Sequence, residues 1–183
     1  MLANCRVMDR KKRLIADHGE LVVGTLPKSV PAAKKFFDAA SDEIILEWAR
    51  RQHTAKADRS EVSTPFASES AHSWFKRNLY RLIKTYVDQG RAEVLLHMAR
   101  GSGRSLVGLP KIKANPFKIA LFGMWSDNVS LSRHQQRVFG TQMQYAYEHN
   151  VEPRYLIGFI AVAGSPQLIA RKLKSNHREP GFI

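Results

Sequence analysis

The chain has 183 residues, 44% of them hydrophobic, and a formal net charge of +13 from 29 Lys and Arg against 16 Asp and Glu. This hydrophobic content is typical of a folded protein and excludes a fully disordered chain. The single cysteine, Cys5, excludes an intramolecular disulfide framework and favours a reducing, cytoplasmic setting.

The sequence predicts no membrane span and no signal peptide. The longest apolar stretch, residues 155–164, is half of the roughly 20 residues that a transmembrane helix requires. The N-terminus lacks the continuous apolar core of a signal peptide. We therefore expect a cytoplasmic protein with a basic N-terminal arm over residues 1–18 and one domain over residues 19–183.

The positive charge is concentrated in one segment. From Val94 to Tyr147 the only acidic residue is Asp127, whereas the same segment contains seven Lys and Arg residues. Solvated protein surfaces usually mix both signs, so this segment favours a polyanionic ligand, with nucleic acid first and an acidic membrane surface second. The alternative is a chance asymmetry that is offset by the acidic residues of 38–69.

In the N-terminal half, β-branched residues between glycine and proline predict a short strand over 19–27. Start signals at Pro31 and at Ser41 predict two short helices, or one kinked helix, over 31–52. Residues 53–70 are polar and aperiodic and predict a flexible loop. An apolar stripe from Trp74 to Val87 at helical spacing predicts a helix over 71–89, with that stripe in the core and Lys76, Arg77, Arg81 and Lys84 facing outward.

In the C-terminal half, short apolar runs predict strands over 93–99, 117–125 and 154–164, with a shorter strand over 126–131. Capping serines predict helices over 132–150, from Ser132, and over 165–176, from Ser165 with Pro166 in the first turn. This order of elements predicts an α/β fold, of the α+β kind, in which helices pack on a small mixed sheet.

The start of the helix at 132–150 is the first candidate site. Its terminal amides and the helix dipole favour phosphate, and Arg133 and Arg137 are one turn apart on one face. His134 lies next to them and is a candidate for proton transfer. The residues are therefore Ser132, Arg133 and Arg137 for phosphate binding and His134 for catalysis, and a solvated basic helix start is the alternative.

The basic loop over 100–116 is the second candidate. Its GSGRS sequence, residues 101–105, allows close backbone approach to phosphate, although a plain flexible loop explains it as well. The candidate nucleic-acid ligands in this region are Arg100, Arg104, Lys111 and Lys113. No metal-binding signature is present among the seven histidines, although carboxylates such as Asp127 or Glu148 are candidates to recruit a divalent ion.

A strand, a turn with Arg and His, a helix and a strong strand in this order resemble the ParB/sulfiredoxin superfamily, whose signature turn, G-[EHC]-[HR]-R, holds nucleotide phosphates. In this chain Ser132 takes the glycine position, His134 a basic position and Arg137 a later arginine, with Arg133 adjacent. Gln135 stands where a second arginine is expected. The small basic chain also resembles the Osa/FiwA-like plasmid fertility-inhibition factors, which adopt that fold.

The resemblance implies DNA binding, nuclease activity, nucleotide hydrolysis with ATP and a divalent metal ion, and interference with conjugative transfer through type IV secretion machinery. Three alternatives stay open. They are a DNA- or RNA-binding regulatory or accessory protein without catalysis, an adaptor that docks on an acidic protein surface, and an unrelated small-molecule enzyme.

Overall fold

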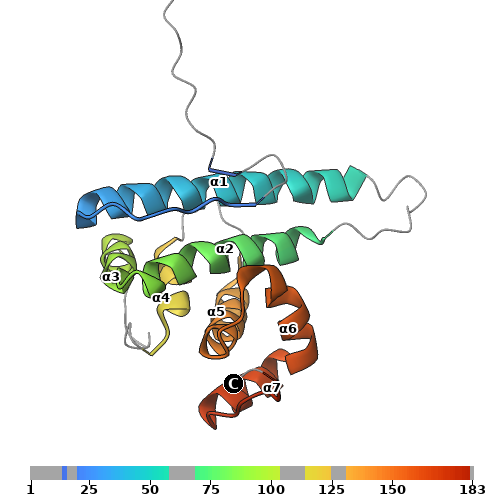
Figure 1. Ribbon diagram of the computed structural model, residues 1–183. Helices are drawn as coiled ribbons and strands as arrows, with labels where there is room; N and C mark the ends of the chain where they lie inside the picture. Colours follow the sequence, from blue (N-terminus) through green and yellow to red (C-terminus); the bar gives the residue numbers. More distant parts are fainter. Residues whose placement is uncertain (1–13, 16–19, 58–68, 104–113, 125–130, 182–183) are drawn as a thin grey trace, which may run out of the picture.

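The computed structural model describes residues 14–15, 20–57, 69–103, 114–124 and 131–181, and all regular structure within these ranges is helical (Figure 1). The expected α/β fold with a ParB/sulfiredoxin-like sheet is therefore wrong for the described part of the chain. There the β structure consists of an isolated bridge between Ile15 and Leu21. The basic arm over 1–18 lies outside the described residues, apart from Leu14 and Ile15.

Three of the predicted strands are helices. Residues 93–99 belong to α3 (Ala92–Gly101), residues 117–125 cover α4 (Pro116–Gly123), and residues 154–164 cover the short 3-10 helix η2 (Pro153–Tyr155) and α6 (Leu156–Ala163). Each run is short and apolar, and period alone does not separate such a run from a buried strand. The predicted strand over 126–131 lies outside the described residues, except for Leu131.

The first helix, α1 (Val30–Ala57), is a single helix of 28 residues, not two. Ser41, predicted as a second helix start, lies buried inside α1, where its hydroxyl donates to the Asp38 carbonyl at 2.9 Å. Because a serine within a helix can bond the preceding turn, a serine followed by acidic residues does not by itself mark a new start. The helix also extends into the predicted loop, of which residues 58–68 are not described.

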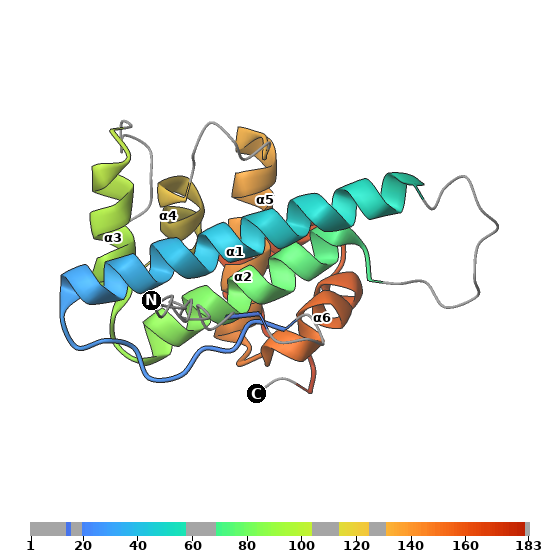
Figure 2. The same ribbon diagram turned by 90° about the horizontal axis from the view of Figure 1, so that it is seen from above.

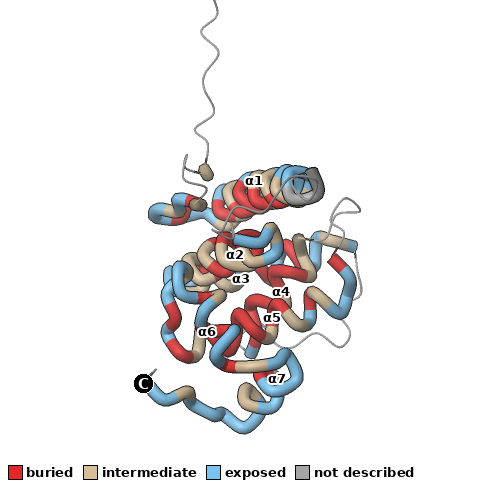
Figure 3. Tube along the Cα trace, turned by 90° about the vertical axis from the view of Figure 1, so that its right-hand side faces the viewer, coloured by how far each residue is buried: buried red, intermediate tan, exposed pale blue. Residues whose placement is uncertain are grey.

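The predicted helix over 71–89 is confirmed as α2 (Ala71–Asp88). Ser70 caps its N-terminus, and the Ser70 hydroxyl accepts from the Ser73 amide at 3.1 Å. Its apolar stripe is buried as expected, and Figure 3 shows buried segments gathered where α1, α2, α4 and α5 meet. Burial raises the pKa of the phenols of Tyr80 and Tyr86, which donate to the carbonyls of Val151 and Ala33. These bonds tie α2 to distant parts of the chain.

The last two predicted helices are confirmed as α5 (Arg133–Glu148), capped by Ser132, and α7 (Pro166–Lys174), capped by Ser165. α1 packs on α2 and α3, α4 lies between α3 and α5, and α7 packs on α5. Figure 2 shows α1 and α2 running alongside each other, with α3, α4 and α5 at a steep angle to them. One apolar core includes residues from Leu21 to Ile169.

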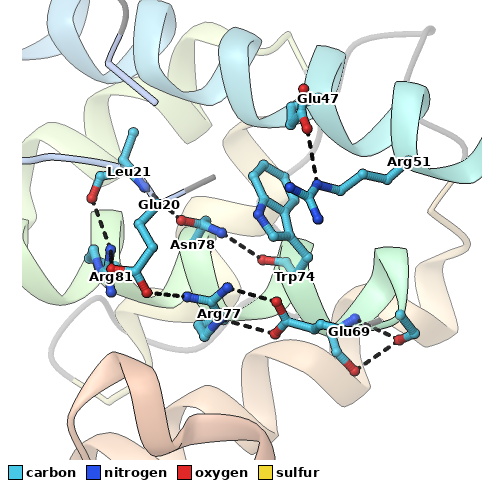
Figure 4. A network of polar contacts seen from close by, with 11 residues as sticks. Glu20, Leu21, Glu47, Arg51, Glu69, Trp74, Arg77, Asn78 and Arg81 are labelled. Carbon is cyan, nitrogen blue, oxygen red and sulfur yellow. Dashed lines mark hydrogen bonds and ion pairs between the residues drawn. The ribbon is translucent and has the colours of Figure 1, made fainter. Parts of the chain in front are cut away.

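A polar network fastens the segment before α1 to α2 (Figure 4). Glu20 accepts from Arg77 at 2.6 Å and from Arg81 at 3.0 Å, and Arg77 also pairs with Glu69 at 2.7 Å. These arginines are half-buried, so the prediction that they face outward is wrong. The buried Asn78 accepts from the Leu21 amide at 2.8 Å, so that Leu21 enters the core with its backbone donor satisfied.

No helix in the described ranges is by itself long and apolar enough to span a membrane. Residues 153–163 and 166–174 reach the necessary length and apolar character only as a pair, and they bend by 97° where they join.

Candidate nucleic-acid interface

The predicted phosphate-binding turn is the capped N-terminus of α5. The Ser132 hydroxyl accepts from the Gln135 amide at 3.2 Å, and the Gln135 side chain accepts from the Ser132 amide at 2.8 Å. This capping box uses two of the amide donors that were expected to be free for phosphate. The amides of Arg133 and His134 stay outside the capping box, so an anion at this end of α5 would meet these two amides and the basic side chains.

The basic side chains of this turn are all exposed. Arg133, His134 and Arg137 lie on the first two turns of α5, and the first turn carries no acidic residue. Arg133 and Arg137 are four residues apart and share one face. Within the described residues the His134 ring has no hydrogen bond that would orient it, so its predicted catalytic role gains no support from this geometry.

The structure brings two further lysines to α5 that no sequence motif singled out. Lys118 of α4 lies over Gly140, where an added Cβ would be 2.6 Å from the Lys118 Cγ and 3.0 Å from its Cα. The absence of a side chain at Gly140 therefore lets α4 lie close to α5. Because Gly140 lies about one helical turn after Arg137, this close approach brings Lys118 near Arg137.

Burial lowers the pKa of Lys118, and the positive charges of Arg137 and Lys174 lower it further. Arg137 of α5 and Lys174 of α7 therefore each lie close enough to Lys118 of α4 to repel its charge. We call the four residues Lys118, Arg133, Arg137 and Lys174 the basic surface. Since like charges at short range destabilise the fold, their convergence favours an anionic ligand.

Many of the cationic side chains on α1 and α2 are paired, in contrast to those of the basic surface. On α1 and α2, cationic side chains form ion pairs within the chain: Lys34 with Asp38, Arg51 with Glu47, Arg77 and Arg81 with Glu20, and Lys84 with Asp88. The four residues of the basic surface form no ion pair with any described acidic residue. Within the described part of the chain, the basic surface therefore keeps its positive charge without a neighbouring carboxylate.

The second predicted site is only partly described. Arg100 is exposed in the last turn of α3, where a cation also complements the helix dipole, and nothing groups it with the basic surface. The GSGRS sequence begins inside α3, and Gly103 follows the helix with φ +69°. Arg104, Lys111 and Lys113 lie outside the described residues, as does Asp127.

Among the residues that the structure describes, no group of three or more His, Cys, Asp and Glu side chains is arranged to hold a metal ion.

The sequence held a signal for Lys118 and Lys174 as candidate phosphate ligands, since both belong to acid-poor basic stretches. Their meeting depends on Gly140 and on the packing of α7, which no local pattern encodes.

No family model, no curated protein and no solved structure matches this chain.

Proposed function

We propose that the protein binds nucleic acid, and DNA in the first place, by contacts from the basic surface to the phosphate backbone. The observation that carries this proposal is that α4 and α7 both pack on α5 and bring Lys118 and Lys174 to the helix that carries Arg137, with no ion pair to an acidic residue in the described ranges. Arginine and lysine are the usual phosphate ligands of proteins, and such contacts are largely independent of sequence. We therefore expect binding without strong base specificity.

The proposal is limited to binding. Hydrolysis of nucleic acid or nucleotide and action on conjugative transfer came with the resemblance to an α/β family, and the helical fold removes the structural basis of that resemblance. His134 is exposed and has no orienting contact in the described part of the chain. A binding role without catalysis needs only the charges that the surface presents.

The test compares two double variants that each remove two exposed positive charges. Arg133→Ala with Arg137→Ala changes the basic surface, and Lys28→Ala with Lys35→Ala changes exposed residues before and on α1. Fluorescence anisotropy with a short DNA duplex gives the dissociation constant at several salt concentrations. We expect the arginine pair to weaken binding by about tenfold or more, and to reduce the slope of log K against log salt by about 0.9 for each phosphate that the variant no longer neutralises.

Equal weakening in the two double variants, or no binding by the parent protein at about 50 mM salt, would contradict the proposal. Polyglutamate of matched charge serves as a competitor. If polyglutamate displaces DNA at equal charge concentration, the surface recognises acidic polymers in general and an acidic protein becomes the better candidate partner.

A further inference from the structure

The chain after α7 folds back onto the C-terminal end of α5. The Arg178 guanidinium donates to the Glu148 carbonyl, and the Glu179 amide donates to the ring of His149 at 2.9 Å. The Glu179 carboxylate accepts from the Tyr145 hydroxyl at 2.8 Å and from Lys172 at 2.6 Å. We call residues 175–181 the C-terminal clasp.

His149 holds the clasp with both ring nitrogens in use. Its side chain is buried, with 4% of the residue exposed. Nδ1 lies 2.7 Å from the Tyr145 carbonyl, which can only accept, so Nδ1 carries the hydrogen. Nε2 accepts from the Glu179 amide, and it must therefore be free of a proton while the clasp is docked.

We propose that the C-terminal clasp is released when His149 takes up a proton. A protonated ring donates at both nitrogens, so the hydrogen on Nε2 would point at the amide hydrogen of Glu179. The docked state would then contain a buried cation and two opposed donors, and both raise its free energy. In the released state the ring reaches water and is protonated without that cost.

Charged groups near the His149 ring include both cations and carboxylates. Lys172 of α7 and Arg178 of the clasp oppose a positive charge there, whereas Glu179 of the clasp and Glu148 of α5 favour one. The Glu179 carboxylate is already bonded to Lys172 and Tyr145, and Glu148 accepts from Gln144 at 2.9 Å. The aromatic rings of Tyr145 and Phe159 also pack on the His149 ring, at centroid distances of 4.4 Å and 5.2 Å.

His177 acts in the opposite direction. Its Nε2 lies 3.8 Å from the Glu179 carboxylate, so its protonation would strengthen the clasp. His177 is exposed, and its attraction to Glu179 is screened by solvent. The donor conflict at the buried His149 should therefore outweigh it, and His177→Gln is the natural control variant.

The size of the effect follows from proton linkage. If the docked ring excludes a proton that the released ring takes up, the docking constant falls by up to about tenfold for each unit by which the pH is lowered once the released ring is protonated. Protonation of Glu179 should weaken docking of the clasp a second time, at more acidic pH. Burial acts to raise the pKa of this carboxyl, but hydrogen bonds from Lys172 and Tyr145 outweigh burial and hold the pKa below its ordinary value of 4.5, so its contribution is lost only below that pH.

The test is an NMR titration of the full-length protein that follows hydrogen exchange and backbone relaxation of the Glu179 amide, with exchange rates corrected for the intrinsic effect of pH. In the parent protein we expect the protection of this amide to fall as the pH is lowered, by up to about tenfold per pH unit, together with the protonation of the His149 ring itself. His149→Gln keeps an acceptor that does not titrate, so its clasp should stay docked. His177→Gln should behave like the parent.

A Glu179 amide that stays protected while the His149 ring becomes protonated would overturn the proposal. So would an equal decrease in protection in the parent and in His149→Gln. If His149→Gln fails to fold, the coincidence of ring protonation and amide release in the parent decides the question alone. DNA binding enters none of these measurements, so the proposal stands or fails separately from the proposed function.

Discussion

At the residue scale, two glycines mark where α4 lies closest to its neighbours. A Cβ on Gly123 would be 2.9 Å from the amide nitrogen and 3.2 Å from the Cα of Ala99 in α3, and one on Gly140 would meet Lys118. The atoms at Gly123 are backbone, which cannot rotate away as a side chain can. Gly123 therefore sets the distance between α3 and α4, and Gly140 sets the distance between α4 and α5.

We expect Gly123→Ala to destabilise the protein by about 1–3 kcal/mol, because the added methyl forces the backbones of α3 and α4 apart. Urea denaturation followed by circular dichroism measures this change. Gly101→Ala is the matched control, since Gly101 lies at the end of α3 with no atom within 4 Å of an added Cβ. The control should be neutral or slightly stabilising, and equal destabilisation of both variants would show that the close approach to Ala99 is not responsible.

At the element scale, α2 connects the two ends of the fold. It packs against α1 on one side and contacts α4, α5 and α6 on another, and Tyr80 and Tyr86 bond backbone carbonyls before and after it in the sequence. Aromatic pairs extend these contacts, with Tyr80 stacked on Phe117 at 5.5 Å and Phe37 meeting Tyr86 edge-on at 5.1 Å. The side chains of the α2 stripe should therefore be among the most costly to truncate.

We expect Leu82→Ala to lower the free energy of unfolding by about 2–5 kcal/mol, because Leu82 is fully buried and its truncation leaves a cavity in the core. Leu46→Ala on α1 makes the same chemical change at a side chain that is 61% exposed. That control should change stability by less than about 0.5 kcal/mol. If chemical denaturation gives the two variants the same stability, α2 does not pack as the structure shows.

At the scale of the whole molecule, the charges set how stability responds to pH. The hydrogen bond from Arg81, with the nearby charges of Arg81 and Arg77, lowers the pKa of Glu20 below its ordinary value of 4.5 despite partial burial. A carboxyl whose pKa is lower in the folded state stabilises the protein fully above its unfolded pKa. The contribution of Glu20 is therefore lost as pH falls below 4.5 toward its folded pKa.

We expect Glu20→Gln to reduce stability at neutral pH by up to about 1 kcal/mol and to flatten the acid limb of the stability curve, because the pair with Arg77 and Arg81 is partly exposed. Melting temperatures across the acid range measure both effects. Glu152→Gln removes a carboxylate from an exposed pair with Arg154 and is the control. An unchanged acid limb in Glu20→Gln would show that the network of Figure 4 does not fasten the N-terminal segment.

The helices whose ends and faces have local signals could be predicted from the amino-acid sequence. Ser70, Ser132 and Ser165 cap helices because a serine hydroxyl can bond the amide three residues later, and the stripe of α2 is buried because its apolar residues share one face. A local signal for α4 was also present, since Asn115 caps it with Pro116 in its first turn, although the apolar run after it suggested a strand. The acid-poor segment likewise indicated where the positive charge would lie.

The helical state of α3, α4 and α6, and the positions of the groups that carry the two proposals, depend on packing between distant parts of the chain. An apolar run that is buried on most sides shows no clear period, so neighbouring helices, and not its own pattern, fix its conformation. Lys118 and Arg137 meet because Gly140 admits α4, and His149 meets Glu179 because the chain after α7 turns back onto α5. These contacts join residues far apart in the sequence, and their energy depends on burial and geometry that exist only in the folded chain.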